Sequence, residues 1–167
     1  MNWGRIFRHL VYFPGRVRRV FPATTLNAIE QAIRVCEDSH QGEIRFAVEG
    51  AIGLLPLLGG VTARQRAIET FSALRVWDTE HNNGVLIYLL LADRKVEIVA
   101  DRGVNRLAGS PVWEGICREM ENAFHQGQFE AGVVGGIRAV GACLATYYPA
   151  QGGAKPNELS DRPVVLQ

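Results

Sequence analysis

The alternation of apolar and polar residues divides the chain into strands and helices. Residues 85–91 form an unbroken apolar run rich in branched side chains, which is typical of a central strand covered on both faces. Residues 94–100 alternate between apolar and polar, which indicates a strand nearer an edge. The tight turn between the two predicts that they are antiparallel. The start of the first strand, at Asn83-Gly84, therefore lies beside the end of the second, at Asp101.

A second pattern predicts a parallel pair. Residues 43–49 alternate as a strand does, and Thr62 is expected to cap a helix that runs to about residue 74. This strand, this helix and strand 85–91 form a β-α-β unit, whose strands should be parallel with a right-handed crossover. Residues 50–61 are apolar but interrupted by glycine and proline, so we expect a packed loop there and not a helix.

Apolar residues at helical spacing predict three further helices, over residues 25–39, 110–125 and 129–147. A short turn is expected at residues 104–107. With the strands above, these elements predict an α/β fold, a three-layer α/β/α sandwich with a small mixed β-sheet.

The chain is expected to contain one domain with a segment at each end. Residues 24–149 carry the periodic pattern, whereas residues 150–167 are polar and have no usable period. This tail is expected to lie over the surface or to be disordered. Residues 1–23 are basic and aromatic and form a separate N-terminal segment.

The N-terminal segment has two interpretations. Residues 1–21 carry five arginines and no acid, and Trp3, Ile6, Phe7 and Leu10 stand at helical spacing. Such a helix could lie on an anionic membrane surface. Alternatively the apolar stripe packs on the domain and the arginines face solvent, which we favour because short basic amphipathic patterns are common. Arginines and a proline interrupt the segment, so a secretory signal is not expected, and no apolar run approaches the length of a bilayer span.

Composition excludes some classes of function. The 167 residues hold 18 basic and 17 acidic side chains, so no overall positive charge favours nucleic acid. Three widely spaced cysteines are best explained as reduced thiols, and no paired cysteine or histidine spacing indicates zinc. The expected location is therefore cytoplasmic, with peripheral attachment to a membrane through residues 1–21 as a further expectation.

The loop before strand 85–91 is the most polar in the chain. Asp78, Glu80, Asn83 and Asp101 are expected to converge at one end of the sheet. Carboxylate and amide oxygens suit calcium or magnesium, and an irregular loop suits calcium better. Further candidate pocket residues are Arg75, Trp77, Asn82 and Arg102. The alternative is that these residues simply form turns and that Trp77 is a packing anchor.

Several separate blocks follow one another between residues 43 and 148: Trp77, Asn83-Gly84-Val85-Leu86-Ile87, the run from Asp93 to Ile98, Asp101-Arg102-Gly103, and the residues from Phe124 to Val133. Together these blocks resemble the TPM domain family. The resemblance implies an α/β/α sandwich of the kind found in bacterial and thylakoid-associated proteins. It also implies a range of roles, since members include reported phosphatases, cation-binding domains and factors for the repair or assembly of membrane complexes.

This chain departs from the family pattern in two ways. The export signal and transmembrane helix that are usual in the family are not expected here, and Asn83 stands where an acid is usual. We therefore expect a non-catalytic binding or accessory domain with an unidentified protein partner, divalent-cation binding and membrane association. The alternative is a metal-dependent phosphatase acting on phosphomonoesters, so the sequence leaves open whether the protein is an enzyme.

Overall fold

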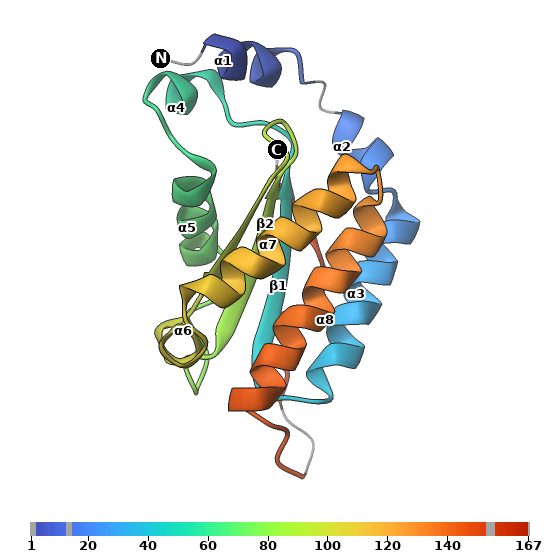
Figure 1. The fold of residues 1–167 in the computed structure, drawn as a ribbon, viewed down its shortest axis with the longest axis vertical. Coiled ribbons are helices and arrows are strands. Elements are labelled where there is room, and N and C mark those ends of the chain that lie inside the picture. The colour runs from blue at the N-terminus through green and yellow to red at the C-terminus, as the bar shows by residue number, and fades with distance from the viewer. Residues whose placement is uncertain (1–2, 13–14, 153–155, 167) are drawn as a thin grey trace.

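The computed structural model describes residues 3–12, 15–152 and 156–166. Eight helices and four strands follow one another in this part of the chain (Figure 1). They are α1 Trp3–Leu10, α2 Gly15–Val20, α3 Ala23–Glu37, β1 Glu43–Glu49, α4 Leu54–Leu58, α5 Ala63–Ala73, β2 Gly84–Leu90, β3 Lys95–Ala100, α6 Arg102–Ala108, α7 Ser110–His125, α8 Phe129–Tyr147 and β4 Val164–Leu166.

The strands form one mixed sheet in the order β3-β2-β1-β4. β1 is parallel to both β2 and β4, whereas β2 and β3 are antiparallel. In this register Gly84 lies opposite Glu43, and Val85 lies opposite Ala100. The predicted β-α-β unit and the predicted antiparallel pair are both confirmed.

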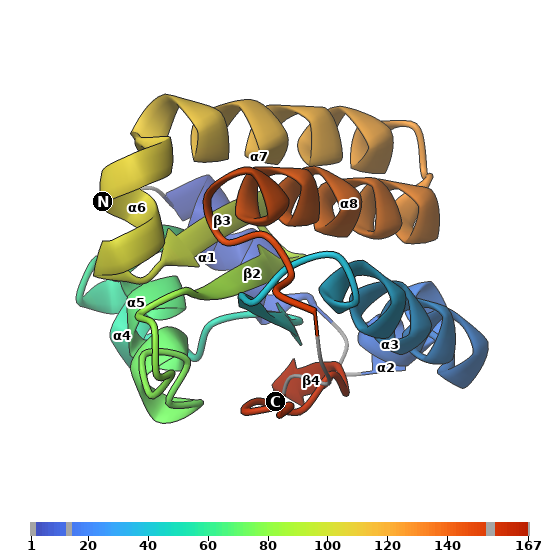
Figure 2. The same ribbon diagram turned by 90° about the horizontal axis from the view of Figure 1, so that it is seen from below.

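Helices cover both faces of the sheet, as Figure 2 shows. Helices α3, α7 and α8 pack on the face that carries Phe46 and Ile87, and this side holds the larger apolar cluster. Helix α5 packs on the other face, against Leu86 and Val99. The predicted α/β/α sandwich is confirmed.

Strand β1 is buried along its whole length although it carries three charged residues. Glu43, Arg45 and Glu49 share the face toward α5 and are at most 8% exposed. Arg66 of α5 donates to both oxygens of Glu49 at 3.1 and 3.0 Å, and Tyr88 donates to Glu49 at 2.5 Å. Burial and the bond to Glu49 both raise the pKa of the Tyr88 hydroxyl, so this group stays protonated. The charged face that the alternation predicts is therefore enclosed and paired.

The expectation of an unstructured tail is wrong for residues 156–166. β4 adds a parallel strand to β1, and the residues before it cover the charged face of β1. Leu159 N donates to Glu43 at 3.2 Å, and Arg45 donates to the carbonyl of Arg162 at 3.2 Å. A strand of three residues is too short to show a period, which is why the pattern missed it.

Two segments expected to be a loop and a turn are short helices. α4 begins after Gly53 and tolerates Pro56 because proline costs little in the first turn of a helix. α6 begins where Asp101 supplies an N-cap. α3 begins at Ala23, two residues before the expected start, and Thr25 donates to Glu130 of α8 at 2.6 Å. The cap predicted at Thr62 is confirmed, and with Gln65 it forms a capping box.

The favoured interpretation of the N-terminal segment is wrong for three of the four residues of its apolar stripe, since only Ile6 is buried. In α1 the side toward the domain carries Arg5 and His9, whereas Trp3 and Phe7 are 68% and 66% exposed. Asp93, in the turn between β2 and β3, accepts from Arg5 at 2.8 Å and so holds the polar side of the helix inward. An ion pair between residues so distant in the sequence leaves no trace in local periodicity.

One described helix, α8, is long and apolar enough to cross a membrane by length and composition alone, a feature that the apolar-run criterion missed. In this fold Val133, Ile137, Val140 and Leu144 of α8 are fully buried and pack in the core. Core packing therefore accounts for the apolar character of this helix.

The two acids that bind Arg66 allow a matched test of the enclosed face. We expect Glu49→Ala to lower the free energy of unfolding by about 3–5 kcal/mol, because it leaves buried polar groups without their partner. Glu69 pairs with the same Arg66 at 2.9 Å but is 55% exposed, so Glu69→Ala should cost less than about 1 kcal/mol. Urea unfolding measures both, and equal losses would contradict this account.

Candidate functional site

Five polar residues meet at the end of the sheet where β1 and β2 begin and β3 ends. We call this group the polar edge: Gln41, Thr79, Asn83, Asp101 and Tyr148. They come from the segment before β1, the loop before β2, the end of β3 and the end of α8. The antiparallel register of β2 and β3 places two of them side by side, because Asp101 N donates to the carbonyl of Gly84 at 2.9 Å.

Asn83 is fully buried and held on two sides. Its backbone N–H donates to the hydroxyl of Thr79 at 3.1 Å, and its side-chain amide donates to the carbonyl of Gln41 at 3.0 Å. The side-chain oxygen is buried and has no hydrogen-bond partner among the described residues. A buried carbonyl without a partner is costly, so this oxygen is available to a ligand.

Asp101 shows the same combination of one engaged and one unsatisfied oxygen. Oδ1 accepts from the backbone N–H of Arg102 at 2.6 Å, where Asp101 caps α6. Oδ2 is buried and lacks a hydrogen-bond partner in the described part of the chain. The start of a helix favours a negative charge, so a carboxylate suits this capping position.

The end of α8 and the start of α6 close the polar edge. Burial raises the pKa of the Tyr148 hydroxyl, and the negative charge of Asp101 raises it further. Gly103 is closely surrounded, since a Cβ there would lie 2.5 Å from the carbonyl oxygen of Asn82 and 2.7 Å from the Tyr148 hydroxyl. The Tyr148 hydroxyl therefore lies next to Gly103 and close enough to Asp101 to feel its charge.

Of the four predicted metal ligands, Asn83 and Asp101 lie at the polar edge, whereas Asp78 and Glu80 lie on the exposed loop. The N–H of Glu80 donates to Glu158 of the tail at 2.9 Å. Within residues 3–12, 15–152 and 156–166, no three acids, histidines or cysteines gather closely enough to hold a metal ion. The edge thus offers one carboxylate and one amide, both unsatisfied.

The predicted pocket residues surround the edge but stay exposed. Arg75 has a positive φ of 52° because it ends α5, where Val76 N bonds back to the carbonyl of Phe71 at 3.0 Å. Trp77 is 50% exposed, so only about half of its side-chain surface is packed against the protein. Asn82 and Arg102 are also exposed.

Sequence reasoning did not find Gln41, Thr79 or Tyr148. Gln41 lies beside Asn83 because β1 is parallel to β2 and both strands begin at this end of the sheet. Tyr148 lies here because α8 ends at the same level. Thr79 left a weak signal, since a hydroxyl four residues before Asn83 can accept from its N–H in a turn.

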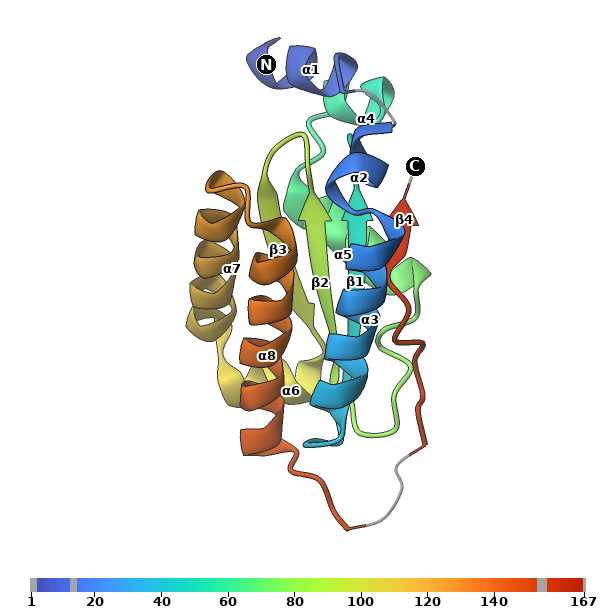
Figure 3. The ribbon, with the colours of Figure 1, turned by 90° about the vertical axis from the view of Figure 1, so that its right-hand side faces the viewer.

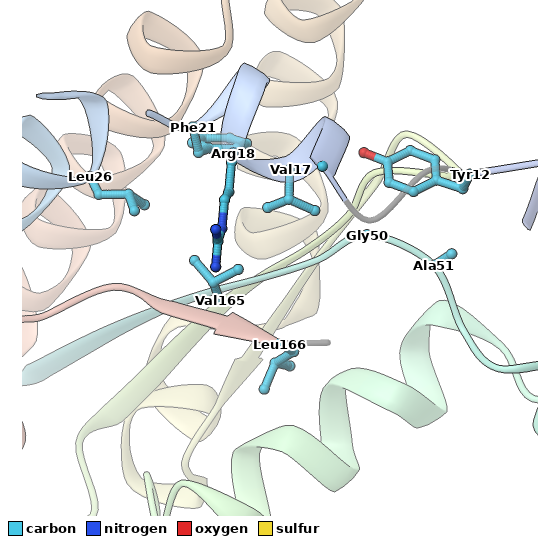
Figure 4. A pocket seen from close by; sticks show the side chains of 10 residues that line it. Tyr12, Val17, Arg18, Phe21, Leu26, Gly50, Ala51, Val165 and Leu166 are labelled. Carbon is cyan, nitrogen blue, oxygen red and sulfur yellow. The ribbon is translucent and has the colours of Figure 1, made fainter. Parts of the chain in front are cut away.

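A second feature lies at the opposite end of the sheet. A cavity of about 630 Å³ opens between α2, α3 and β4, and Figure 4 shows its lining. Phe21, Leu26 and Val165 make most of this lining apolar, and the side chain of Arg18 extends toward Val165. None of the described lining residues is an aspartate, a glutamate or a histidine.

Comparisons with known proteins agree with this architecture. The profile of the TPM domain matches residues 17–143. The NMR structure of the BA42 protein from the psychrophilic bacterium Bizionia argentinensis is similar, with 31% sequence identity and a TM-score of 0.75. The similarity covers 86% of this chain and 93% of that one. No curated protein matches the chain.

Two more distant structures share the fold. The N-terminal domain of a protein from P. gingivalis is 18% identical with a TM-score of 0.57, over 74% of this chain and 76% of that one. The N-terminal domain of the cg2496 protein from Corynebacterium glutamicum is 14% identical with a TM-score of 0.55, over 80% of this chain and 78% of that one.

The loop of the polar edge requires glycine at the start of β2. A Cβ on Gly84 would lie 2.0 Å from the backbone oxygen of Val76, so Gly84→Ala must displace the loop. We expect this change to lower the free energy of unfolding by about 3 kcal/mol. Gly135→Ala is the control, because that helical position has open space and alanine should stabilise it by about 0.5–1 kcal/mol. If urea unfolding gave the same loss of stability for Gly84→Ala and Gly135→Ala, the close contact between the loop and Gly84 would be contradicted.

Proposed function

This chain belongs to the TPM domain family, and we propose that it is a non-catalytic binding or accessory domain whose polar edge binds a divalent cation, calcium before magnesium. The observation that supports the proposal is the pair of unsatisfied buried oxygens, Oδ1 of Asn83 and Oδ2 of Asp101. Calcium accepts amide, carboxylate and backbone oxygens in irregular arrangements and completes its shell with water.

The donor set fits a cation of modest affinity. One carboxylate and one amide supply less charge than the clusters that hold calcium tightly. Asp78 and Glu80 are exposed on the adjacent loop, so they can add charge only if the loop closes over the edge. We propose that Asn83 and Asp101 are the primary ligands and that the loop acids contribute second.

The surroundings of Asp101 favour binding over catalysis. One oxygen of Asp101 is fixed as a helix cap, and no histidine or second acid within the described residues is hydrogen-bonded to it. His81 is exposed on the loop. Proton transfer needs an acid or base within hydrogen-bond reach of the reacting group, and Asp101 alone supplies no such pair.

The second candidate is a metal-dependent phosphatase acting on phosphomonoesters. Arg75 and Arg102 are exposed beside the edge and could balance the charge of a phosphate. A bound cation would supply Lewis-acid polarisation of the phosphoryl oxygen. We rank this second because Asp101 is the only acid among the five residues that define the polar edge, and within the described part of the chain no cluster of three metal-binding side chains occurs.

We also propose that the accessory role is exercised at a membrane, with residues 1–21 as the attachment. The excess of arginine over acid in this segment supports that part of the proposal.

Cation binding is tested by thermal unfolding in calcium, in magnesium and in chelator. At about 100 times its dissociation constant calcium should add about 2.7 kcal/mol, a rise in Tm of roughly 5–10 °C. Asp101→Asn should abolish the rise yet keep its Tm in chelator, because asparagine caps a helix as well as aspartate does. Asp38→Asn, at an exposed acid at the end of α3, is the control and should respond as the wild type does.

Equal Tm values of the wild type in calcium and in chelator would remove the cation site. The phosphatase alternative has its own readout. If the protein hydrolyses p-nitrophenyl phosphate with a metal requirement, and Asp101→Asn abolishes turnover, the enzyme replaces the binding domain.

A further inference from the structure

Helix α1 is held to the domain by its polar side. Asp93 binds Arg5 at 2.8 Å, Arg8 at 3.2 Å and the Nε2 of His9 at 3.1 Å. The Nδ1 of His9 accepts from the backbone N–H of Ile52 at 3.0 Å, which assigns the ring proton to Nε2. Burial raises the pKa of Asp93, but the bonds from Arg5 and His9 outweigh it and bring that pKa below its ordinary value. These contacts fix the rotation of the helix about its axis.

This rotation turns the apolar side of α1 away from the protein. Trp3, Phe7 and Leu10 are 68%, 66% and 59% exposed, whereas Ile6 is 7% exposed. An amphipathic helix normally buries its apolar side to gain hydrophobic stabilisation. Here ion pairs select the opposite orientation, so the apolar side is left for an external partner.

Helix α4 extends the exposed apolar surface. The two helices lie side by side at the end of the sheet where β1 and β2 finish (Figures 1 and 3). Leu55 is 81% exposed on a helix of five residues. Half of the fourteen exposed large apolar side chains in the described part of the chain lie here. We call this surface the tip: Trp3, Phe7, Leu10, Val11, Leu54, Leu55 and Leu58.

Basic side chains flank the tip. A groove of about 730 Å³ beside α1 is lined in part by Arg8, Arg16 and Arg94. The two acids in its lining are already engaged, since Asp93 binds Arg5 and Glu121 binds Lys95 at 3.2 Å. The first 29 residues of the chain contain no acid at all. The charge next to the tip is therefore positive in excess.

We propose that the tip docks on an anionic lipid bilayer, with α1 and α4 lying in the headgroup region and the flanking arginines on lipid phosphates. The inference rests on the proposed accessory role at a membrane and names the surface and the lipid class. Exposed tryptophan, phenylalanine and leucine beside an arginine rim are what interfacial helices present to lipid. The excess positive charge repels a second copy of the tip, which favours an anionic surface over self-association.

The test is sedimentation of the full chain with vesicles of phosphatidylcholine, with and without about a quarter phosphatidylglycerol. We expect binding only to the anionic vesicles, weakened by added salt. Phe7→Ala combined with Leu55→Ala should weaken binding at least about tenfold, because two apolar side chains no longer leave water. Val35→Ala combined with Ile68→Ala removes two exposed apolar side chains elsewhere on the surface and should bind as the wild type does.

Fluorescence provides a second readout in the same samples. Trp3 is in water in the free protein, so its emission should shift to shorter wavelength on anionic vesicles. The shift should vanish in Trp3→Phe while binding is largely kept, since phenylalanine is also apolar. Circular dichroism and Tm of every variant should match those of the wild type, because each altered side chain is exposed.

The possible failures point to different parts of the argument. If the wild type binds neither vesicle, both the membrane role and the tip are wrong. If the wild type binds but the Phe7 and Leu55 variant binds equally well, the membrane role stands and the tip is wrong. Equal binding to neutral and anionic vesicles overturns the anionic partner. A lipid-free dimer that the same variant dissociates overturns the bilayer in favour of a second copy.

Discussion

The structure depends on enclosing a charged face of its central strand. β1 lies between β2 and β4, and Glu43, Arg45 and Glu49 all point to the face that α5 shares. An unpaired charge in such a place costs several kcal/mol, which is a large fraction of the net stability of a domain. Arg66 and Tyr88 must therefore meet Glu49, which positions α5, and the tail must reach Glu43 and Arg45. The charged face of β1 therefore determines where both α5 and the tail lie.

This dependence explains which elements could be predicted. β2 and helices α7 and α8 bury apolar residues at regular spacing, so their period alone indicates them. The tail and α1 are held by partners that are distant in sequence: Arg45 with the carbonyl of Arg162, and Arg5 with Asp93. The periodicity of a segment predicts which side faces the protein only when hydrophobic burial determines its orientation. For α1, ion pairs decide it, and the predicted orientation was reversed.

The candidate site shows the same division. Antiparallel pairing of β2 and β3 follows from their pattern, and it was enough to predict that Asn83 and Asp101 meet. The positions of Asp78 and Glu80 depend on how the loop packs. Two contacts determine that packing: the close approach of Val76 to Gly84, and the hydrogen bond from Glu80 N to Glu158. Neither contact has a signature in residue type. The sequence therefore identifies the sheet end, while the number of acids that gather there is a property of loop packing.

The polar edge and the tip lie at opposite ends of the same strands. β1 and β2 run seven residues each from one to the other, which at about 3.3 Å per residue separates the two by roughly 23 Å. If the tip lies among lipid headgroups, the polar edge stands in water at more than two Debye lengths from the charged surface under physiological salt. The lipid charge then neither supplies nor competes for a cation at Asp101. On the two proposals together, the ends would act independently, with the domain held at a membrane by the tip while the polar edge faces solution.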